Sequence, residues 1–116
     1  MIRRAVWVQA EVEAVHAWPE CDVAGVGYLR GPHRHVFKVE VKVEVTNPDR
    51  EVEFISLKHW LTERLREQYE YKDLGRKSCE DIALEIFEAL KDVALRPISV
   101  SVSEDGENGA EVWESS

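Results

Sequence analysis

The sequence predicts an α+β domain in which a four-stranded antiparallel sheet carries two helices on one face. Two segments near the N-terminus alternate between an apolar and a mainly polar face, as strands with one buried face do. Two central segments place their apolar residues at helical spacing, and two short alternating segments follow near the C-terminus. The predicted order is therefore ββααββ, in a single domain that covers residues 1–116.

The two N-terminal segments, at about 3–18 and 33–46, form the first two predicted strands. In the second segment the odd positions from Phe37 to Val45 are all apolar and share one face. The long connection between the segments is rich in glycine, and loops of this length in small domains are often functional. If the two strands pair as an antiparallel hairpin, the end of the first lies beside the start of the second.

Each predicted helix starts at a residue suited to cap it. Ser56 can cap a helix over the apolar positions up to Leu65, and Ser78 opens a Ser-Cys-Glu-Asp sequence that resembles a capping box. A linker at 69–77 joins the helices, Pro97 opens the third strand, and a turn at 105–109 leads to the last strand. The residues predicted to face the core from the third strand are Ile98, Val100 and Val102.

The composition excludes several classes of protein. Apolar residues make up 44% and charged residues 33%, a balance typical of globular domains, and no apolar run approaches the ~18 residues of a membrane span. A net charge of −8 argues against nucleic-acid or membrane-surface partners, which favour a basic face. With only Cys21 and Cys79, and no secretory cleavage region at the start, we expect a cytoplasmic protein without a disulfide framework.

Three of the four histidines lie on the apolar face of a predicted strand, near its end. His16 closes the first strand, while His33 and His35 open the second. The hairpin would bring these three imidazoles together and leave a fourth position open for water or substrate, an arrangement typical of catalytic zinc sites. An isolated His-x-His pair is a weak signal by itself, so packing remains the alternative interpretation.

Glu104 continues the inward face of the third strand. An unpaired inward carboxylate is costly, so either the strand frays at this point or Glu104 receives hydrogen bonds from a ligand.

The segment 23–39 contains no acidic residue, although Arg30 and Arg34 belong to it. This local excess of positive charge is either chance or a binding site for an anionic ligand.

Five motifs in order resemble the 6-pyruvoyl-tetrahydropterin synthase and 6-carboxytetrahydropterin synthase family, over nearly the whole chain. The family has a zinc-binding histidine after its first strand, a His-x-His motif opening the second, and characteristic sequences before each helix and on the third strand. The matching segments here are AVH at 14–16, HRHVF at 33–37, EFISLK at 53–58, KSCEDIA at 77–83 and VSVSE at 100–104.

The resemblance implies a tunnelling fold whose subunits assemble into an oligomeric barrel, and we expect a homo-oligomer, a trimer-based hexamer. It implies that His16, His33 and His35 hold Zn²⁺ and that Glu104 anchors a pterin ring. The usual substrate of the family is 7,8-dihydroneopterin triphosphate, and the phosphates of this substrate are the anionic groups that Arg30 and Arg34 would meet.

The chain departs from the family where protons are moved. The family's catalytic cysteine precedes the first histidine of the His-x-His pair by four residues, and that position is Leu29 here. Cys21 lies in the same loop and is the candidate catalytic base, with a packing role as the alternative. The family's Asp-His segment between the helices has no counterpart in 69–74; His59 is a substitute only if it is not a surface residue.

Three functions follow from these observations. The first is a zinc-dependent lyase of pterin biosynthesis or of the 7-deazaguanine branch that leads to queuosine. The second is a diverged member that binds zinc and a pterin- or guanine-like ligand without the standard synthase activity, or catalyses another step such as a retro-aldol cleavage. The third is an oligomeric structural protein that uses only the fold, against which the histidines and Glu104 argue.

Overall fold

The computed structural model describes residues 1–115 and has the predicted element order. Two long strands, β1 (Arg4–His16) and β2 (His33–Val45), are followed by helices α1 (Phe54–Gln68) and α2 (Cys79–Asp92), and then by β3 (Pro97–Glu104) and β4 (Asn108–Trp113). A short 3-10 helix (Gly27–Arg30) interrupts the loop between β1 and β2. The four strands form one antiparallel sheet, as predicted, and their order within it is β1-β2-β3-β4.

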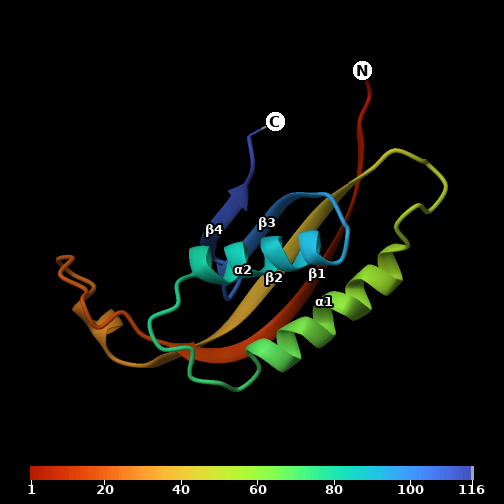
Figure 1. Cartoon of the computed structure of the whole chain (residues 1–116). Helices are drawn as coiled ribbons and strands as arrows, with labels where there is room; N and C mark the ends of the chain where they lie inside the picture. Colours follow the sequence, from red (N-terminus) through yellow and green to blue (C-terminus); the bar gives the residue numbers. More distant parts are fainter. Residues whose placement is uncertain (116) are drawn as a thin grey trace.

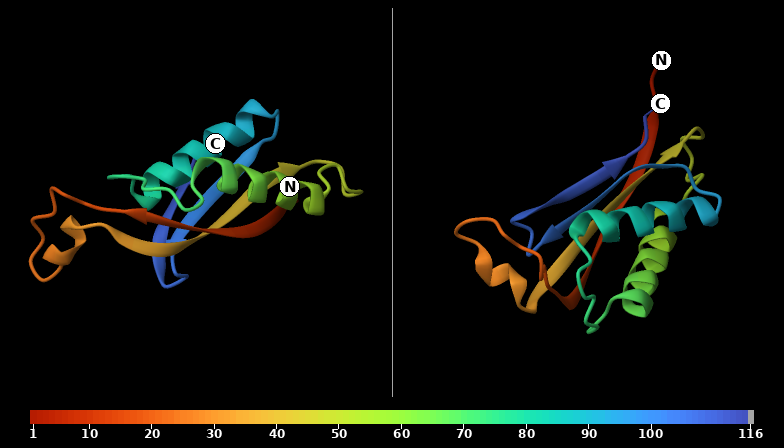
Figure 2. Two further views of the ribbon diagram at one scale, coloured as in Figure 1. Left: turned by 90° about the horizontal axis from the view of Figure 1, so that it is seen from below. Right: turned by 60° about the vertical axis from the view of Figure 1, so that its left-hand side comes forward.

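Both helices cover the same face of the sheet, and the 17–32 loop extends beyond it as an arm (Figures 1 and 2). The core lies between the helices and the sheet, where alternate strand residues meet the apolar sides of α1 and α2. The largest fully buried side chains are Phe37, Val39, Val41, Val43, Leu61, Leu65, Ile82, Ile86, Leu90, Val100 and Val102. Burial of this apolar surface is the main term that stabilises the fold.

The start of α1 differs from the prediction. Its N-cap is Glu53 rather than Ser56, because the Glu53 carboxylate accepts hydrogen bonds from the backbone N–H groups of Ile55 (2.8 Å) and Ser56 (3.0 Å). The helix therefore begins at Phe54. The prediction for α2 is confirmed: Ser78 is the N-cap, and its side chain and that of Asp81 form a reciprocal capping box.

One residue of β3 also departs from the expected pattern. Val100 and Val102 are buried, but Ile98 is 36% exposed. The pairing of β2 with β3 shifts between Lys42 and Val43, which breaks the two-residue alternation at Ile98.

The linker between the helices runs along the free edge of β1 instead of forming a detached loop. Four backbone hydrogen bonds of 2.7–3.0 Å join residues 71–75 to residues 13–17, and Val15 forms a parallel bridge with Asp73. This segment therefore extends the sheet locally beside the end of β1, where His16 lies.

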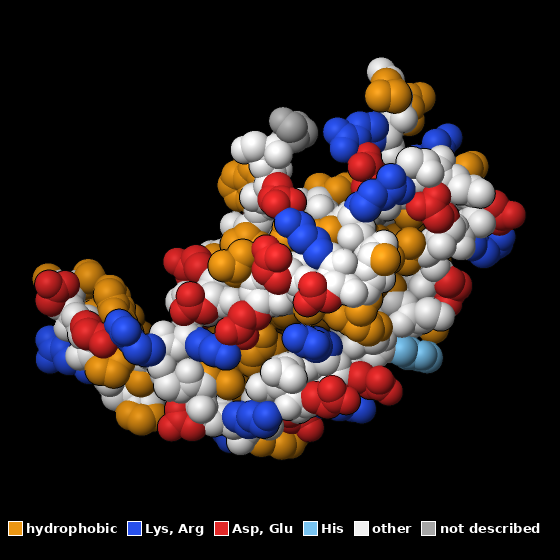
Figure 3. All heavy atoms as spheres, in the orientation of Figure 1, with side chains coloured by type: hydrophobic (Ala, Val, Ile, Leu, Met, Phe, Trp, Pro, Cys, Tyr) orange, Lys and Arg blue, Asp and Glu red, His pale blue; other side chains and the backbone are white. Residues whose placement is uncertain are grey.

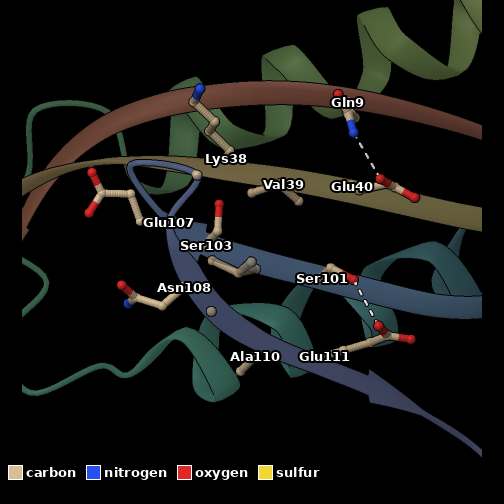
Figure 4. A pocket seen from close by; sticks show the side chains of 13 residues that line it. Gln9, Lys38, Val39, Glu40, Ser101, Ser103, Glu107, Asn108, Ala110 and Glu111 are labelled. Carbon is tan, nitrogen blue, oxygen red and sulfur yellow. Dashed lines mark hydrogen bonds between the residues drawn. The ribbon is translucent and has the colours of Figure 1, made fainter.

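The other face of the sheet is not covered by the helices and is mostly polar, although the exposed Trp7 and Trp113 lie on it. A hollow of about 570 Å³ lies on this face. Figure 4 shows the side chains that line it, among which Gln9 donates a hydrogen bond to Glu40 (2.8 Å) and Ser101 donates one to Glu111 (3.3 Å). On the side seen in Figure 3, acidic and basic side chains are interspersed over the helices, and the arm carries apolar groups. Its exposed apolar residues include Trp18, Val23 and Tyr28. No helix within the described residues is both long enough and apolar enough to cross a membrane.

Candidate metal centre

The hairpin of β1 and β2 brings the three predicted histidines together. His16 is the register partner of His33, and His35 pairs with Ala14 two positions further along. The ring centroid of His16 lies 4.6 Å from that of His33 and 5.4 Å from that of His35, and the centroids of His33 and His35 are 5.0 Å apart. The convergence predicted from the strand faces is thus present in the structure.

Glu104 completes this cluster from the end of β3. Its register partner is Phe37, two residues beyond His35, so its side chain lies on the inward face, as predicted, and points to the histidines. Glu104 Oε2 lies 2.8 Å from His16 Nε2 and 3.4 Å from His35 Nε2. One candidate ligand atom from each of the four residues lies within 4.8 Å of the others, so the group can hold a metal ion.

The three histidines are oriented in the same way. Each ring places Nδ1 against an acceptor: the carbonyl of Lys77 for His16 (2.8 Å), the carbonyl of Gly31 for His33 (2.9 Å), and the carboxylate of Asp105 for His35 (2.7 Å). A carbonyl or carboxylate oxygen can only accept, so the ring donates from Nδ1, and in the neutral ring the lone pair then lies on Nε2. All three Nε2 atoms are therefore available as ligands.

Two of these atoms are buried without a hydrogen bond. The Nε2 atoms of His16 and His35 lie within reach of Glu104 but have no hydrogen-bond partner among the described residues. The lone pairs of the two rings thus face a carboxylate oxygen, a repulsive contact unless a cation lies between them or a ring is protonated. Imidazole nitrogen and carboxylate oxygen are ligands that Zn²⁺ accepts, so the donor set fits the predicted metal.

A pocket of about 640 Å³ opens beside the cluster. Its wall includes His16, His33, Glu104 and the start of α2. Leu29 also lines it, so the position that corresponds to the family's catalytic cysteine faces this pocket with an apolar side chain.

Of the two cysteines, Cys79 lines this pocket and Cys21 is not among its lining residues. Burial, with a further contribution from the Glu104 and Glu80 carboxylates, raises the pKa of Cys79 to about 12, so the thiol is neutral at physiological pH. Cys21 is buried in the arm, with its Sγ 3.6 Å from the carbonyl oxygen of Val26. Sequence reasoning did not assign Cys79 a role at the site, although its place at the start of α2 was predicted.

The two predicted phosphate-binding arginines both contact their own chain. Arg30 donates from Nε to the carbonyl of Cys21 (2.8 Å), and Arg34 pairs with Glu13 (3.2 Å). Arg34 occupies an even position of β2, on the opposite face from His33 and His35. The cations that line the pocket are instead Arg76 and Lys77, which are also paired with Glu20 and Glu85 respectively.

His59 is exposed on α1, in agreement with a surface role. Asp105, by contrast, is a site residue that the sequence analysis placed only in a turn. The pKa of Asp105 is lowered, mainly by the hydrogen bond from the backbone N–H of Val36 and next by His35, so this carboxylate stays ionised.

Comparisons with known proteins agree with this architecture. The structure of the uncharacterized protein WS1659 from Wolinella succinogenes superposes with a TM-score of 0.83 at 13% identity, covering 99% of this chain and 100% of that one. The 6-pyruvoyl tetrahydropterin synthase of Caenorhabditis elegans superposes with a TM-score of 0.77 at 16% identity, covering 99% and 98%. No family model and no curated protein sequence matches the chain. The chain therefore has the fold of 6-pyruvoyl tetrahydropterin synthase, at a sequence identity of only 16%.

Proposed function

We propose that this protein binds one Zn²⁺ through His16, His33 and His35 and acts as a lyase on 7,8-dihydroneopterin triphosphate or a related pterin. The observation that carries the proposal is the arrangement of the three rings, each with Nδ1 tied to an acceptor and each offering a ligand atom to one cluster. Acceptors on the outer nitrogen of a ligating histidine are the usual support of protein metal sites.

A bound zinc ion supplies a Lewis acid that polarises an oxygen of the ligand. The chain's own residues then position the ligand in the pocket. Glu104 presents Oε2 to the histidines, while its Oε1 accepts a weak hydrogen bond from Asn108 (3.3 Å). Ring N–H groups of a pterin are donors of the kind that a carboxylate binds, so Glu104 is the proposed anchor.

Proton movement is the part of the proposed reaction for which this chain lacks residues of the family's motifs. We retain Cys21 as the proposed base, in which case the arm must move to bring its thiol to the pocket. Arg30 and Arg34 remain the proposed phosphate contacts. Arg30 would have to release the carbonyl of Cys21, and Arg34 would have to release Glu13 and reach the site from the opposite face of β2. The proposed assembly is a trimer-based hexamer in the cytoplasm, with the 7-deazaguanine branch as the alternative pathway.

Leu29 favours a second candidate function. Because this apolar side chain lines the pocket where the family's catalytic cysteine is expected, the protein is alternatively a zinc protein that binds a pterin- or guanine-like ligand without the synthase reaction.

The test has two stages. Metal analysis of the purified protein is expected to give about one zinc per chain, and a chain that binds no zinc contradicts the proposal. The zinc-loaded protein is then incubated with 7,8-dihydroneopterin triphosphate, and substrate and products are separated by chromatography. Turnover supports the lyase, whereas a rise in melting temperature without turnover supports the binding protein.

The matched variants for this assay are Glu104→Gln and Glu107→Gln. Both remove one negative charge from the same end of the β3–β4 hairpin, but only Glu104 faces the histidines. Glu104→Gln is expected to abolish turnover or ligand binding, and Glu107→Gln to preserve it. Equal behaviour of the two variants would remove Glu104 from the proposed site.

A further inference from the structure

Asp105 makes three hydrogen bonds to the start of β2. Its side chain accepts from the backbone N–H of Val36 through Oδ1 (2.9 Å) and from Nδ1 of His35 through Oδ2 (2.7 Å). Its own backbone N–H donates to the carbonyl of Val36 (2.8 Å). Each carboxylate oxygen therefore has a different donor, one from the strand and one from a candidate metal ligand.

These bonds lie where regular pairing of β2 with β3 has ended. The β2–β3 ladder starts at the pair Phe37 and Glu104, so residues 33–36 have no partner on β3. Asp105 extends the ladder by one step, with its side chain in the place of the missing acceptor. The segment that carries two of the three candidate ligands is thus attached to β3 through this residue.

The left-handed backbone conformation of Asp105 allows its hydrogen bonds to Val36 and His35. Asp105 and Gly106 have φ angles of 59° and 75°, and the N–H of Glu107 bonds to the carbonyl of Glu104 (3.1 Å), as in a tight hairpin turn with both central residues left-handed. Aspartate tolerates this conformation better than most residues other than glycine and asparagine. The turn therefore supplies Glu104 and Asp105 to the site together.

We propose that Asp105 is a positioning residue of the metal site: it holds His35 in the Nδ1–H tautomer and directs its Nε2 lone pair toward the other ligands. This inference rests on the proposed metal binding. His16 and His33 donate to neutral carbonyls, whereas His35 donates to a carboxylate. A carboxylate partner increases the basicity of the ring and orients it, and losing such a partner typically lowers metal affinity 10- to 100-fold.

Replacement by asparagine separates positioning from folding. Asparagine has the size of aspartate and also tolerates the left-handed turn, but it has only one acceptor oxygen. If that oxygen receives the Val36 N–H, the amide NH₂ points at His35 Nδ1 and favours the wrong tautomer. If the amide is reversed, the NH₂ group meets the Val36 N–H instead. Asp105→Asn therefore cannot satisfy both donors.

The experiment compares Asp105→Asn with Glu107→Gln. The second variant also removes one charge from this turn, but the side chain of Glu107 lines the hollow on the uncovered face of the sheet (Figure 4). Zinc affinity is measured by competition with a chromophoric chelator. We expect Asp105→Asn to bind zinc about 10- to 100-fold more weakly than the wild type and Glu107→Gln to stay within about twofold of it.

A second readout uses the metal-free proteins. The ¹⁵N chemical shifts of the His35 ring, from spectra that correlate ring nitrogens with ring protons, report which nitrogen carries the proton. The wild type and Glu107→Gln are expected to show the Nδ1–H form, and Asp105→Asn a loss of it. If Asp105→Asn does not fold, Asp105→Gly keeps the left-handed turn and is expected to show the same loss of affinity and tautomer.

Wild-type affinity together with the Nδ1–H tautomer in the variant overturns the role of Asp105 and leaves the proposed function intact. A wild type that binds no zinc overturns the proposed function, while the metal-free spectra still test whether Asp105 sets the tautomer.

Discussion

His16 donates from Nδ1 to the carbonyl of Lys77 at 2.8 Å, which joins the last residue of β1 to a position 61 residues later in the chain. Lys77 directly precedes Ser78, the N-cap of α2. The orientation of one candidate ligand thus depends on where α2 begins, and α2 in turn is fixed by its packing on the sheet. The carbonyl of Lys77 therefore links the position of α2 to the orientation of the His16 ring.

Ser78→Ala is expected to destabilise the folded protein by about 1 kcal/mol, because the side chain of Ser78 caps the backbone N–H of Asp81. The control is Ser56→Ala, at the position where the sequence predicted a cap that Glu53 supplies instead. Ser56→Ala is expected to change the free energy of unfolding by no more than about 0.5 kcal/mol. Urea unfolding of the metal-free proteins measures both, and equal costs for the two variants would contradict the assignment of the caps.

Gly109→Ala is expected to destabilise the protein by about 1–3 kcal/mol, as overpacking does. A Cβ at this position would lie 2.2 Å from the carbonyl oxygen of Val102 and 2.6 Å from Cα of Ser103, so β3 and β4 would have to move apart. Gly31→Ala is the matched control, since nothing lies within 4 Å of its Cβ position and its φ of −87° suits alanine. Thermal unfolding of both variants tests the difference, and a tolerated Gly109→Ala would show that the strands are not this close.

Cys79 is expected to react slowly with iodoacetamide at pH 8. A pKa raised to about 12, mainly by burial, lowers the thiolate fraction about a thousandfold relative to an ordinary cysteine, and the greater nucleophilicity of a basic thiolate offsets only part of this. We expect alkylation at least about tenfold slower than at the same residue in the urea-unfolded protein. Mass spectrometry of the labelled peptides measures the rates, and equal rates would place Cys79 in an exposed or ionised state.

The pH dependence of stability gives a further test at Glu53. Hydrogen bonds from the N–H groups of Ile55 and Ser56 lower the pKa of this carboxyl below its ordinary value of 4.5. Its contribution to stability is therefore complete above about pH 4.5 and is lost as the pH falls through the lowered pKa. Glu53→Gln should be less stable than the wild type at pH 7, and the difference should shrink below pH 4. Urea midpoints between pH 7 and pH 3 measure it, and a constant difference would contradict the role of the carboxylate charge.

The alternation of the strands predicted most of the site. His16, His33, His35 and Glu104 could each be assigned to an inward face from the two-residue period alone, and the hairpin then required the first three to meet. The supporting groups could not be found in this way. The acceptors for His16 and His33 are backbone carbonyls, which no side chain marks, and Asp105 belongs to a turn sequence that is typical of hairpins in general.

The two predictions about the fold that were wrong, the cap at Ser56 and the burial of Ile98, have local physical causes. Serine is a more usual helix cap than glutamate, so the residue types favoured Ser56 over a Glu53 carboxylate that accepts from the N–H groups of α1. The exposure of Ile98 follows from the register shift between Lys42 and Val43, which depends on how two strands meet and not on the sequence of either one.

The position of the three histidines on one hairpin also bears on the order in which the chain folds. The ligands are close in sequence and can meet as soon as β1 and β2 pair, at a small loss of loop entropy. The acceptors that orient His16 and His35 are 61 and 70 residues away, so they arrive only after α2 and the β3–β4 hairpin have docked. A nascent chain would thus bring its three imidazoles together early and orient the rings of His16 and His35 last. Local opening of the C-terminal half would misalign these two rings while the imidazoles stay together.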